Sequence, residues 1–264
     1  MSIPRLYCPG LQAGHLTLSA EEVHHAAGVL RLKQGEAVEL FDGAGGIAQG
    51  VMDRVGRREV VVAAGAVSHN PFEFERRLTI AVAAPKAHRQ SYLIENCTEL
   101  GAAAIWPLEC ARSVATPGTA AVEKWRRRAI EAAKQSRRCW VPRVELPRTL
   151  GEALSCASEF SGVGFMHPDA RAVSVDQLLA SIAERHAAIL MLIGPEGGWT
   201  DGEVGQAAQA GATMVHMGPA ILRTETAAMA VCAVCALRAV GPASVSPCPF
   251  PQSGPIESPT DKRS

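Results

Sequence analysis

The sequence predicts a parallel α/β domain preceded by a smaller unit of short β-strands. Three features of the 264-residue chain support this fold class. Short apolar segments alternate with helical segments after residue 76, a pattern typical of a parallel sheet covered by helices on both faces. Several short β-rich segments at close spacing come before residue 70, which favours a small barrel. Glycine-rich turns follow two of the later strands, at the edge where open α/β sheets bind ligands.

The N-terminal unit is expected over residues 1–70. Ser19 and Glu22 have the spacing of a capping box, so a helix is predicted from Ala20 to about Leu30. Asp42-Gly43 supplies a hairpin turn between the first two strands that follow. The expected strands are Ala37–Phe41, Ile47–Arg54 and Glu59–Ala64, and His69–Glu75 is predicted to be a linker.

The second unit is expected over residues 76–240. Its predicted strands are Leu78–Ala84, Ala103–Leu108, Gly162–Met166, Ala188–Ile193 and Thr213–Met217. The helical segments are Ser91–Leu100, Ala120–Arg138, Val175–Arg185, Asp201–Ala210 and Thr224–Val240. Residues 241–264 are rich in Pro and Ser, so we expect a disordered tail there.

The composition excludes several classes of protein. Apolar residues make up 47% of the chain, and 26 basic residues balance 26 acidic ones. These values exclude a disordered chain and a uniformly basic nucleic-acid coat protein. No segment reaches the ~18 apolar residues of a membrane span, and the first residues lack the apolar core of a signal peptide. We therefore expect a cytoplasmic protein with no membrane partner.

Metal binding is not expected. Cys232 and Cys235 form the C-x-x-C pair of the chain. The pair lies in an apolar helical segment without a second pair or clustered His, whereas a structural zinc site needs four ligands. Small core-facing residues are the favoured interpretation, and redox or metal chemistry is the alternative.

The first candidate site is the turn after the predicted strand that ends at Ile193. Gly194-Pro195-Glu196-Gly197-Gly198 leads to Thr200 and Glu203, which have the spacing of a second capping box. Such a turn brings bare backbone close to a ligand. It lacks both the dinucleotide fingerprint and the Lys-Ser/Thr of a P-loop, so a nucleotide phosphate is not expected. An ordinary β–α turn would show the same pattern.

The second candidate site follows Met217. A Gly-Pro turn leads to Arg223, Thr224 and Glu225 at the start of an apolar helix. An acid in a first helical turn already has a structural role, because it opposes the helix dipole. A cation there is mildly unfavourable, so Arg223 is the better candidate for a functional residue.

A basic segment from Lys124 to Arg148 contains nine basic and two acidic residues, which leaves a local charge of +7. Such a patch attracts a phosphate backbone, although a solvated helix face would look similar.

Several of these segments together resemble the uridine-N3 methyltransferases of 16S ribosomal RNA, which belong to the SPOUT superfamily. The most specific pieces are IGPEGG at Ile193–Gly198, followed by Glu203, and MGPAILRTETA at Met217–Ala227. The resemblance covers residues 3–240, in order. Its weaker pieces are His25, Val29–Arg31, Phe41–Gly43, Lys86, Thr98–Gly101, Pro107, Arg112-Ser113, Ala132, Gln135, Arg138, Pro142 and His167-Pro168. Ala220 departs from the family, which commonly has Arg at this place.

The resemblance implies a PUA-like β-barrel for RNA binding, a SPOUT domain with a C-terminal trefoil knot, and a homodimer. It also implies S-adenosylmethionine as the cofactor, held by three knot loops. Mapped onto this chain, the cofactor-binding residues would be Met166, His167, Ile193, Gly194, Pro195, Glu196, Gly197, Gly198, Met217, Gly218, Ile221 and Leu222.

The implied reaction is methylation of N3 of a uridine in 16S ribosomal RNA of the small subunit. Uridine N3 carries a proton, so the enzyme must remove it or stabilise the anion. Arg223 is the candidate for stabilising charge on the uracil carbonyls, and Glu225 or Glu196 for accepting the proton. RNA would be held by Arg31 and Arg5 of the small unit together with Arg112, Lys124, Arg127, Lys134 and Arg138. The alternatives are ribose 2′-O-methylation and a ribosome assembly factor that binds RNA without catalysis.

Overall fold

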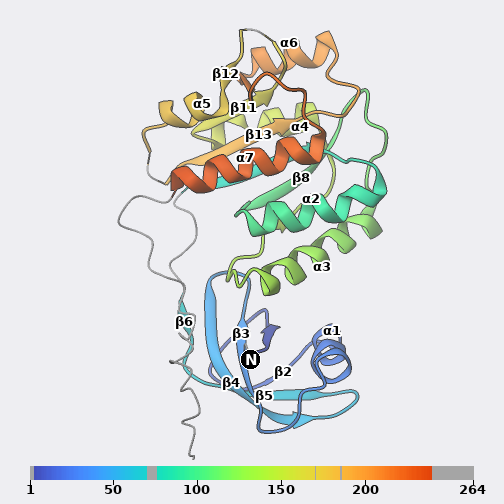
Figure 1. Cartoon of the computed structure of the whole chain (residues 1–264), viewed down its shortest axis with the longest axis vertical. Helices are drawn as coiled ribbons and strands as arrows, with labels where there is room; N and C mark the ends of the chain where they lie inside the picture. The colour runs from blue at the N-terminus through green and yellow to red at the C-terminus, as the bar shows by residue number, and fades with distance from the viewer. Residues whose placement is uncertain (1–2, 70–75, 170, 185, 240–264) are drawn as a thin grey trace, which may run out of the picture.

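The computed structural model describes residues 3–69, 76–169, 171–184 and 186–239. Two domains are stacked along the long axis of the molecule, the smaller one formed by the N-terminal part of the chain (Figure 1). No helix in these described residues is both long and apolar enough to cross a bilayer.

The small domain is built around one six-stranded sheet. Its strand order is β1-β3-β4-β5-β2, and β6 pairs with β4. Its apolar core includes Leu6, Val38, Leu40 and Met52, none of which is exposed. The strands are β1 (Arg5–Tyr7), β2 (Gly14–Thr17), β3 (Ala37–Phe41), β4 (Gly46–Val55), β5 (Val60–Ala64) and β6 (Ser68–His69).

The helix of the small domain changes type along its length. Helix α1 (Ala20–Val23) continues directly into a π-helical stretch (His24–Val29). Ser19 caps α1 by accepting from the backbone N–H of Glu22. The Glu22 side chain does not complete the capping box, because one of its oxygens accepts from the N–H of Tyr7 instead, at 3.2 Å.

The large domain contains an eight-stranded sheet in which every pairing is parallel. The order is β10-β8-β7-β13-β11-β14-β12, with β9 beside β8. Its central strands are continuous apolar runs because helices cover both of their faces. The strands are β7 (Arg77–Ala83), β8 (Ala104–Glu109), β9 (Arg143–Val144), β10 (Arg148–Thr149), β11 (Gly162–Met166), β12 (Val173–Ser174), β13 (Ala188–Ile193) and β14 (Thr213–His216).

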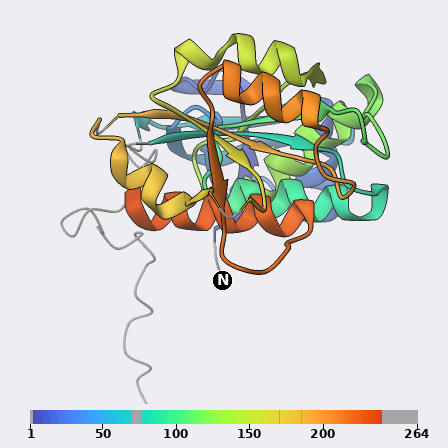
Figure 2. The same ribbon diagram turned by 90° about the horizontal axis from the view of Figure 1, so that it is seen from above.

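Helices form a layer on each face of this sheet (Figure 2). One layer holds α2 (Ala87–Glu99), α3 (Thr119–Gln135), α5 (Val175–Ser181) and α7 (Thr224–Ala239), and its core cluster contains Leu93, Ile94 and Val231. The opposite layer holds α4 (Leu150–Ser155), α6 (Asp201–Gln209) and the 3₁₀ turn Ala157–Glu159, packed on Phe165 and Leu192.

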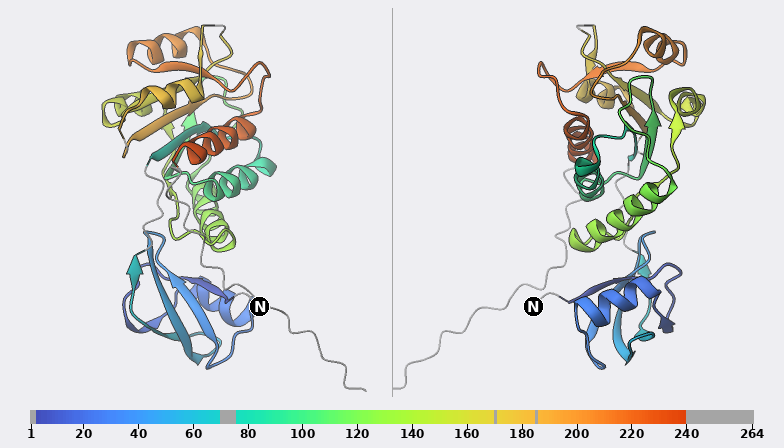
Figure 3. Two further views of the ribbon diagram at one scale, coloured as in Figure 1. Left: turned by 60° about the vertical axis from the view of Figure 1, so that its left-hand side comes forward. Right: turned by 90° about the vertical axis from the view of Figure 1, so that its right-hand side faces the viewer.

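A buried ion pair and the hydrogen bonds of a buried arginine join the two domains, and α3 is the helix that lies nearest to the small domain (Figure 3). Arg5 of β1 donates to the carbonyl oxygens of Ala133 and Arg138 and pairs with Glu39 at 2.7 Å. Lys134 of α3 pairs with Glu22, and both side chains are less than 8% exposed.

The parallel sheet, the hairpin at Asp42-Gly43 and the order of the main elements are confirmed. Several predicted bounds are wrong: α2 begins at Ala87 rather than Ser91, α5 ends at Ser181 rather than Arg185, and the expected Ala20–Leu30 helix is partly π-helical. The elements that the pattern missed are short ones, namely α4, β1, β2, β6, β9, β10 and β12. Of the predicted linker His69–Glu75, the structure describes only His69, which ends β6; the rest of the linker and the predicted tail at 241–264 lie outside the described residues.

Candidate functional site

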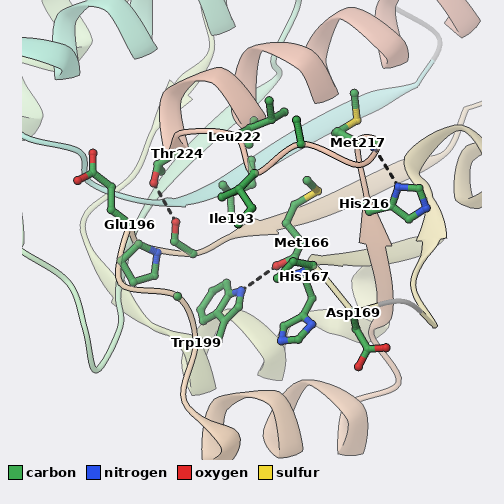
Figure 4. A pocket seen from close by; sticks show the side chains of 18 of the residues that line it. Met166, His167, Asp169, Ile193, Glu196, Trp199, His216, Met217, Leu222 and Thr224 are labelled. Carbon is green, nitrogen blue, oxygen red and sulfur yellow. Dashed lines mark hydrogen bonds between the residues drawn. The ribbon is translucent and has the colours of Figure 1, made fainter.

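Three loops meet at the carboxyl edge of the large sheet and enclose a cavity of about 650 Å³. They follow β11, β13 and β14, which are neighbours in the order β13-β11-β14. Parallel strands end at the same edge, so the loops that follow Met166, Ile193 and His216 come together there although they are far apart in the chain. The cavity is lined mainly by apolar side chains and loop backbone, and Figure 4 shows Met166, Ile193, Met217 and Leu222 around it.

The turn after β13 needs glycine for two separate reasons. At Gly194, a Cβ would lie 2.6 Å from the Trp199 ring, so no side chain fits there. Gly198 has a φ of +70°, a left-handed conformation that favours glycine. The Trp199 indole N–H donates to the carbonyl of Met166 at 2.9 Å (Figure 4). The loop after β13 is thereby fastened to the loop after β11.

The capping box predicted at Thr200 and Glu203 is present and begins α6. Glu203 also accepts from the N–H of Ala111 at 2.9 Å, although it lies far away in sequence. Burial opposes ionisation of this carboxyl, yet hydrogen bonds from Thr200 and Ala111 outweigh it and lower the pKa of Glu203. Arg112 donates to the carbonyls of Gly197 and Trp199. The segment after β8 therefore holds the glycine-rich turn in place.

The turn after β14 is attached to the same wall of the cavity. Gly218 has a φ of +108°, and its N–H donates to Nδ1 of His216 at 2.9 Å. Thr224, at the start of α7, donates to the carbonyl of Gly194 at 3.1 Å (Figure 4). This bond ties the two candidate turns of the sequence together.

A three-membered charge cluster lies next to the cavity. The Arg89 guanidinium of α2 is 3.1 Å from Oε1 of Glu196 and 3.2 Å from Oε1 of Glu225. Glu196 lines the cavity and its side chain is 36% exposed, whereas that of Glu225 is 6% exposed and does not line it. Arg223 is exposed to solvent and forms no ion pair with the part of the chain that the structure describes.

Polar groups also lie at the end of the cavity formed by the loop after β11. The side-chain hydrogen bond from Arg171 holds the pKa of Asp169 well below its usual range. The Nδ1 atom of His167 is buried and has no hydrogen-bond partner among the described residues. Asp169 and His167 are both cavity-lining residues (Figure 4).

Of the twelve residues predicted to bind the cofactor, all but Gly197 line this one cavity. Gly197 packs against Arg112 instead. The cavity is also lined by Pro219 and Ala220, which lie inside the predicted loop Met217–Leu222, and by residues beside the predicted loops that the sequence did not single out for the cofactor, namely Pro168, Asp169, Trp199, His216, Thr224 and Ala227. The sequence reading also missed Arg89, whose position in α2 gave no signal until the fold placed it beside the two acids.

The predicted RNA-binding residues divide into two groups. Arg31, Lys124 and Arg127 are exposed. The others are engaged within the protein: Lys134 and Arg5 are buried at the domain junction, Arg138 donates to the carbonyl of Thr98, and Arg112 holds the turn at Gly197. Lys134 and Arg5 are each paired with a carboxylate inside the protein, so the exposed members of the set, Arg31, Lys124 and Arg127, are better placed for RNA.

The interpretation of Cys232 and Cys235 as core residues is confirmed. Both are buried in α7, and burial raises the pKa of Cys235 to about 12. A hydrogen bond with Cys97, together with burial, raises the pKa of Cys232. No group of three or more metal-ligating side chains occurs within the described residues.

Comparison with known sequences shows matches over both domains. An RNA methyltransferase domain matches residues 72–236, and an RNA methyltransferase PUA domain matches residues 18–63. The ribosomal RNA small subunit methyltransferase E of Mycobacterium bovis is 35% identical over 245 residues, covering 88% of this chain and 90% of that protein. The protein of the same name from Synechocystis is 32% identical over 80% of this chain and 69% of its own length.

Solved structures agree with these matches. A ribosomal RNA small subunit methyltransferase E from Neisseria gonorrhoeae, bound to S-adenosylmethionine, superimposes with a TM-score of 0.78 at 31% identity, covering 88% of this chain and 96% of that one. A Legionella pneumophila protein described as a methyltransferase, in complex with the same cofactor, gives 0.82 at 27% identity and covers 90% of this chain and 98% of that one.

Proposed function

This chain belongs to the ribosomal RNA small subunit methyltransferase E family, and we propose that it methylates N3 of a uridine in 16S ribosomal RNA, with S-adenosylmethionine as the methyl donor. The observation that carries this proposal is the cavity at the carboxyl edge of the sheet, which gathers both glycine-rich turns of the sequence around one space. Two structures with the same fold were solved with this donor bound.

The residues around the cavity fit such a donor. A volume of about 650 Å³ lies within the usual range of small-molecule sites. The apolar side chains of Ile193, Leu222 and Met166 offer a surface for the adenine ring. The unpartnered Nδ1 of His167 is a buried polar atom that a ligand could satisfy. The carboxylate of Glu196 suits the positive charge of a sulfonium.

Each candidate catalytic residue has a defined task in this proposal. S-adenosylmethionine supplies an activated methyl group on sulfur. N3 of the uridine must lose its proton before its electron pair can form the new N–C bond, and Glu196 or Glu225 is the acceptor for that proton. Arg223, exposed at the start of α7, stabilises the negative charge that spreads to the uracil carbonyls.

The exposed basic residues Arg31, Lys124 and Arg127 supply phosphate contacts for the RNA. They lie on the small domain and on α3, the helix that faces it. Binding to phosphates releases counterions, so affinity for RNA should fall steeply as the salt concentration rises. We expect this reaction to take place in the cytoplasm, on the small ribosomal subunit or its RNA.

The finer features of the fold are also part of the proposal. We expect the small sheet to act as a PUA-like barrel and the C-terminal turns to form a trefoil knot. The hydrogen bond of Thr224 with Gly194 supports the knot. It shows that the chain leaving β14 passes beside the turn after β13, and α7 then packs on β7 and β13. We also expect a homodimer; exposed apolar or aromatic side chains on the neighbouring helices α7 and α2, Leu237 at 78% and Tyr92 at 50%, support a contact with a second copy.

The test is methyl transfer in vitro. Purified protein, labelled S-adenosylmethionine and small subunits from a strain lacking the corresponding enzyme are combined, and the digested nucleosides are analysed by mass spectrometry. The proposal predicts N3-methyluridine. A methyl group on ribose would show 2′-O-methylation instead, and the absence of transfer together with RNA binding would indicate a non-catalytic assembly factor.

The variant Arg223→Ala tests the charge-stabilising role. Loss of one preorganised donor should lower kcat by about 10²-fold, while affinity for S-adenosylmethionine, measured by calorimetry, stays within a factor of about three. Unchanged turnover removes Arg223 from the mechanism.

A further inference from the structure

Arg89 occupies an unusual position for a cation. It lies in the first turn of α2, where the helix dipole disfavours positive charge. The side chain is nevertheless held in place, because a single atom, Nη1, lies 3.1 Å from Glu196 and 3.2 Å from Glu225. These two acids belong to the two candidate turns, after β13 and at the start of α7. The guanidinium therefore joins three separate segments at one point.

The two acids of this cluster are not equivalent. Glu225 is buried, and its second oxygen, Oε2, has no hydrogen-bond partner among the described residues. Arg89 is its ion-pair partner in this part of the chain, and a buried carboxylate needs such a partner. Glu196 is 36% exposed and lines the cavity, so a ligand can reach it. The geometry suits Glu225 as an anchor and Glu196 as a group in contact with substrate.

The guanidinium of Arg89 has N–H donors that are not used within the described residues and could bind a ligand. Its side chain is 24% exposed, and the interactions found within the described residues use only Nη1. A guanidinium has five N–H donors in a planar fork. Arg89 does not itself line the cavity, but its Nη1 lies 3.1 Å from Glu196, which does. Arg89 and Glu196 thus present hydrogen-bond donors beside an acceptor. This arrangement complements uracil, in which a carbonyl oxygen that accepts lies next to the N3–H that donates.

We propose that Arg89 is a catalytic residue that donates hydrogen bonds to a carbonyl oxygen of the target uracil, that Glu196 accepts the N3 proton, and that Glu225 is a positioning residue that fixes Arg89. This inference rests on the proposed function and assigns separate roles to its two acids. The N3–H bond breaks and its proton passes to Glu196. The electron pair on N3 forms the bond to the methyl carbon, and the pair of the broken S–CH₃ bond stays on sulfur.

The positioning role of Glu225 gives the proposal a specific test. If Glu225 acts only through Arg89, then removing the charge of Glu225 should have little further effect on kcat in a protein that already lacks Arg89. We would measure kcat, KM for both substrates, calorimetric affinity for S-adenosylmethionine and thermal stability for wild type, Arg89→Gln, Glu225→Gln and the double variant. Arg54→Gln is the matched control, because Arg54 forms an exposed pair with Glu59 on the small domain, away from the cavity.

Arg89→Gln should lower kcat about 10²-fold, the usual effect of removing one donor to a developing anion. Affinity for S-adenosylmethionine should stay within a factor of about three, and the double variant should be no slower than Arg89→Gln alone. Arg54→Gln should match wild type. The proposal would be overturned if the kcat losses of Arg89→Gln and Glu225→Gln multiplied in the double variant, or if Arg89→Gln had the kcat of wild type. It would also be overturned if Arg89→Gln raised KM for RNA at unchanged kcat, because that result indicates a phosphate contact.

Arg89→Lys covers the case in which Arg89→Gln does not fold. Lysine keeps the charge but loses the planar fork, so its kcat should lie between those of wild type and the glutamine variant. A wild-type kcat for the lysine variant would contradict the role of the fork. If wild-type protein itself transfers no methyl group to ribosomal RNA, the proposed function fails, whereas an active wild type with an equally active Arg89→Gln refutes only the present inference.

Discussion

At the scale of single residues, the site depends on close contacts that leave no room for larger side chains. Gly194 lies against the ring of Trp199, and the Trp199 indole holds the carbonyl of Met166. One residue thus connects the loops after β13 and β11. The motif predicted that glycine is needed here, but the partner Trp199 became evident only from the fold.

Gly194→Ala should damage this connection. The added Cβ would lie 2.6 Å from the indole, so Trp199 must shift, and overpacking of this kind costs about 1–3 kcal/mol. We expect lower stability in urea unfolding and at least about tenfold weaker binding of S-adenosylmethionine. Gly205→Ala in α6 is the control: its added Cβ would point into open space, and the substitution should stabilise the helix by roughly 0.5–1 kcal/mol. Unaltered cofactor affinity in Gly194→Ala would contradict this view of the turn.

At the scale of elements, the start of α6 connects the sheet edge to the cavity wall. Glu203 closes the capping box with Thr200 and also receives the N–H of Ala111, so one carboxylate secures the glycine-rich turn from two sides. The S/T-x-x-E spacing predicted the first of these roles. It could not predict the second, because Ala111 is brought close only by the parallel pairing of the strands.

The lowered pKa of Glu203 has a consequence for acid stability. A carboxyl whose pKa is lower in the folded state stabilises the protein above its unfolded value of 4.5, and this contribution is lost as the pH falls through the folded value. Thermal stability should therefore decline below about pH 4.5, and Glu203→Gln should be less stable than wild type at pH 7 with a smaller decline in acid. A parallel decline in both proteins would show that other groups control acid unfolding.

The sequence predicted the long, periodic elements and both glycine-rich turns, because these depend on local pattern. It missed β1 and β12, which are too short to show a period, and the positive charge of Lys134 gave no sign of a partner in another domain. The roles of Arg89 and Trp199 were likewise not predictable, since each depends on contacts between segments far apart in the chain.

At the scale of the whole molecule, a buried ion pair and side-chain hydrogen bonds join the two domains. Lys134 of α3 neutralises Glu22 of the small domain, and Arg5 of the small domain donates to the carbonyls of Ala133 and Arg138, at a junction where little solvent can substitute for a lost partner. The RNA contacts proposed on the small domain and on α3 are therefore held in a fixed relation to the cavity.

Lys134→Met should weaken this junction. Removing one member of a buried pair leaves the carboxylate of Glu22 uncompensated, which typically costs about 3–5 kcal/mol. Chemical denaturation should show this loss, and the added change Glu22→Gln should recover part of it, because the unpaired charge is then absent. If the single variant is as stable as wild type, the pair contributes nothing to the junction.

The central claim is that the loops after β11, β13 and β14 hold the methyl donor. A crystal structure of this protein grown with S-adenosylmethionine tests it most directly. We predict the donor between Gly194–Gly198 and Met217–Leu222, with its methyl group facing the side of the cavity where Glu196 lies. An empty cavity at saturating donor, or a donor bound elsewhere on the molecule, would contradict the account.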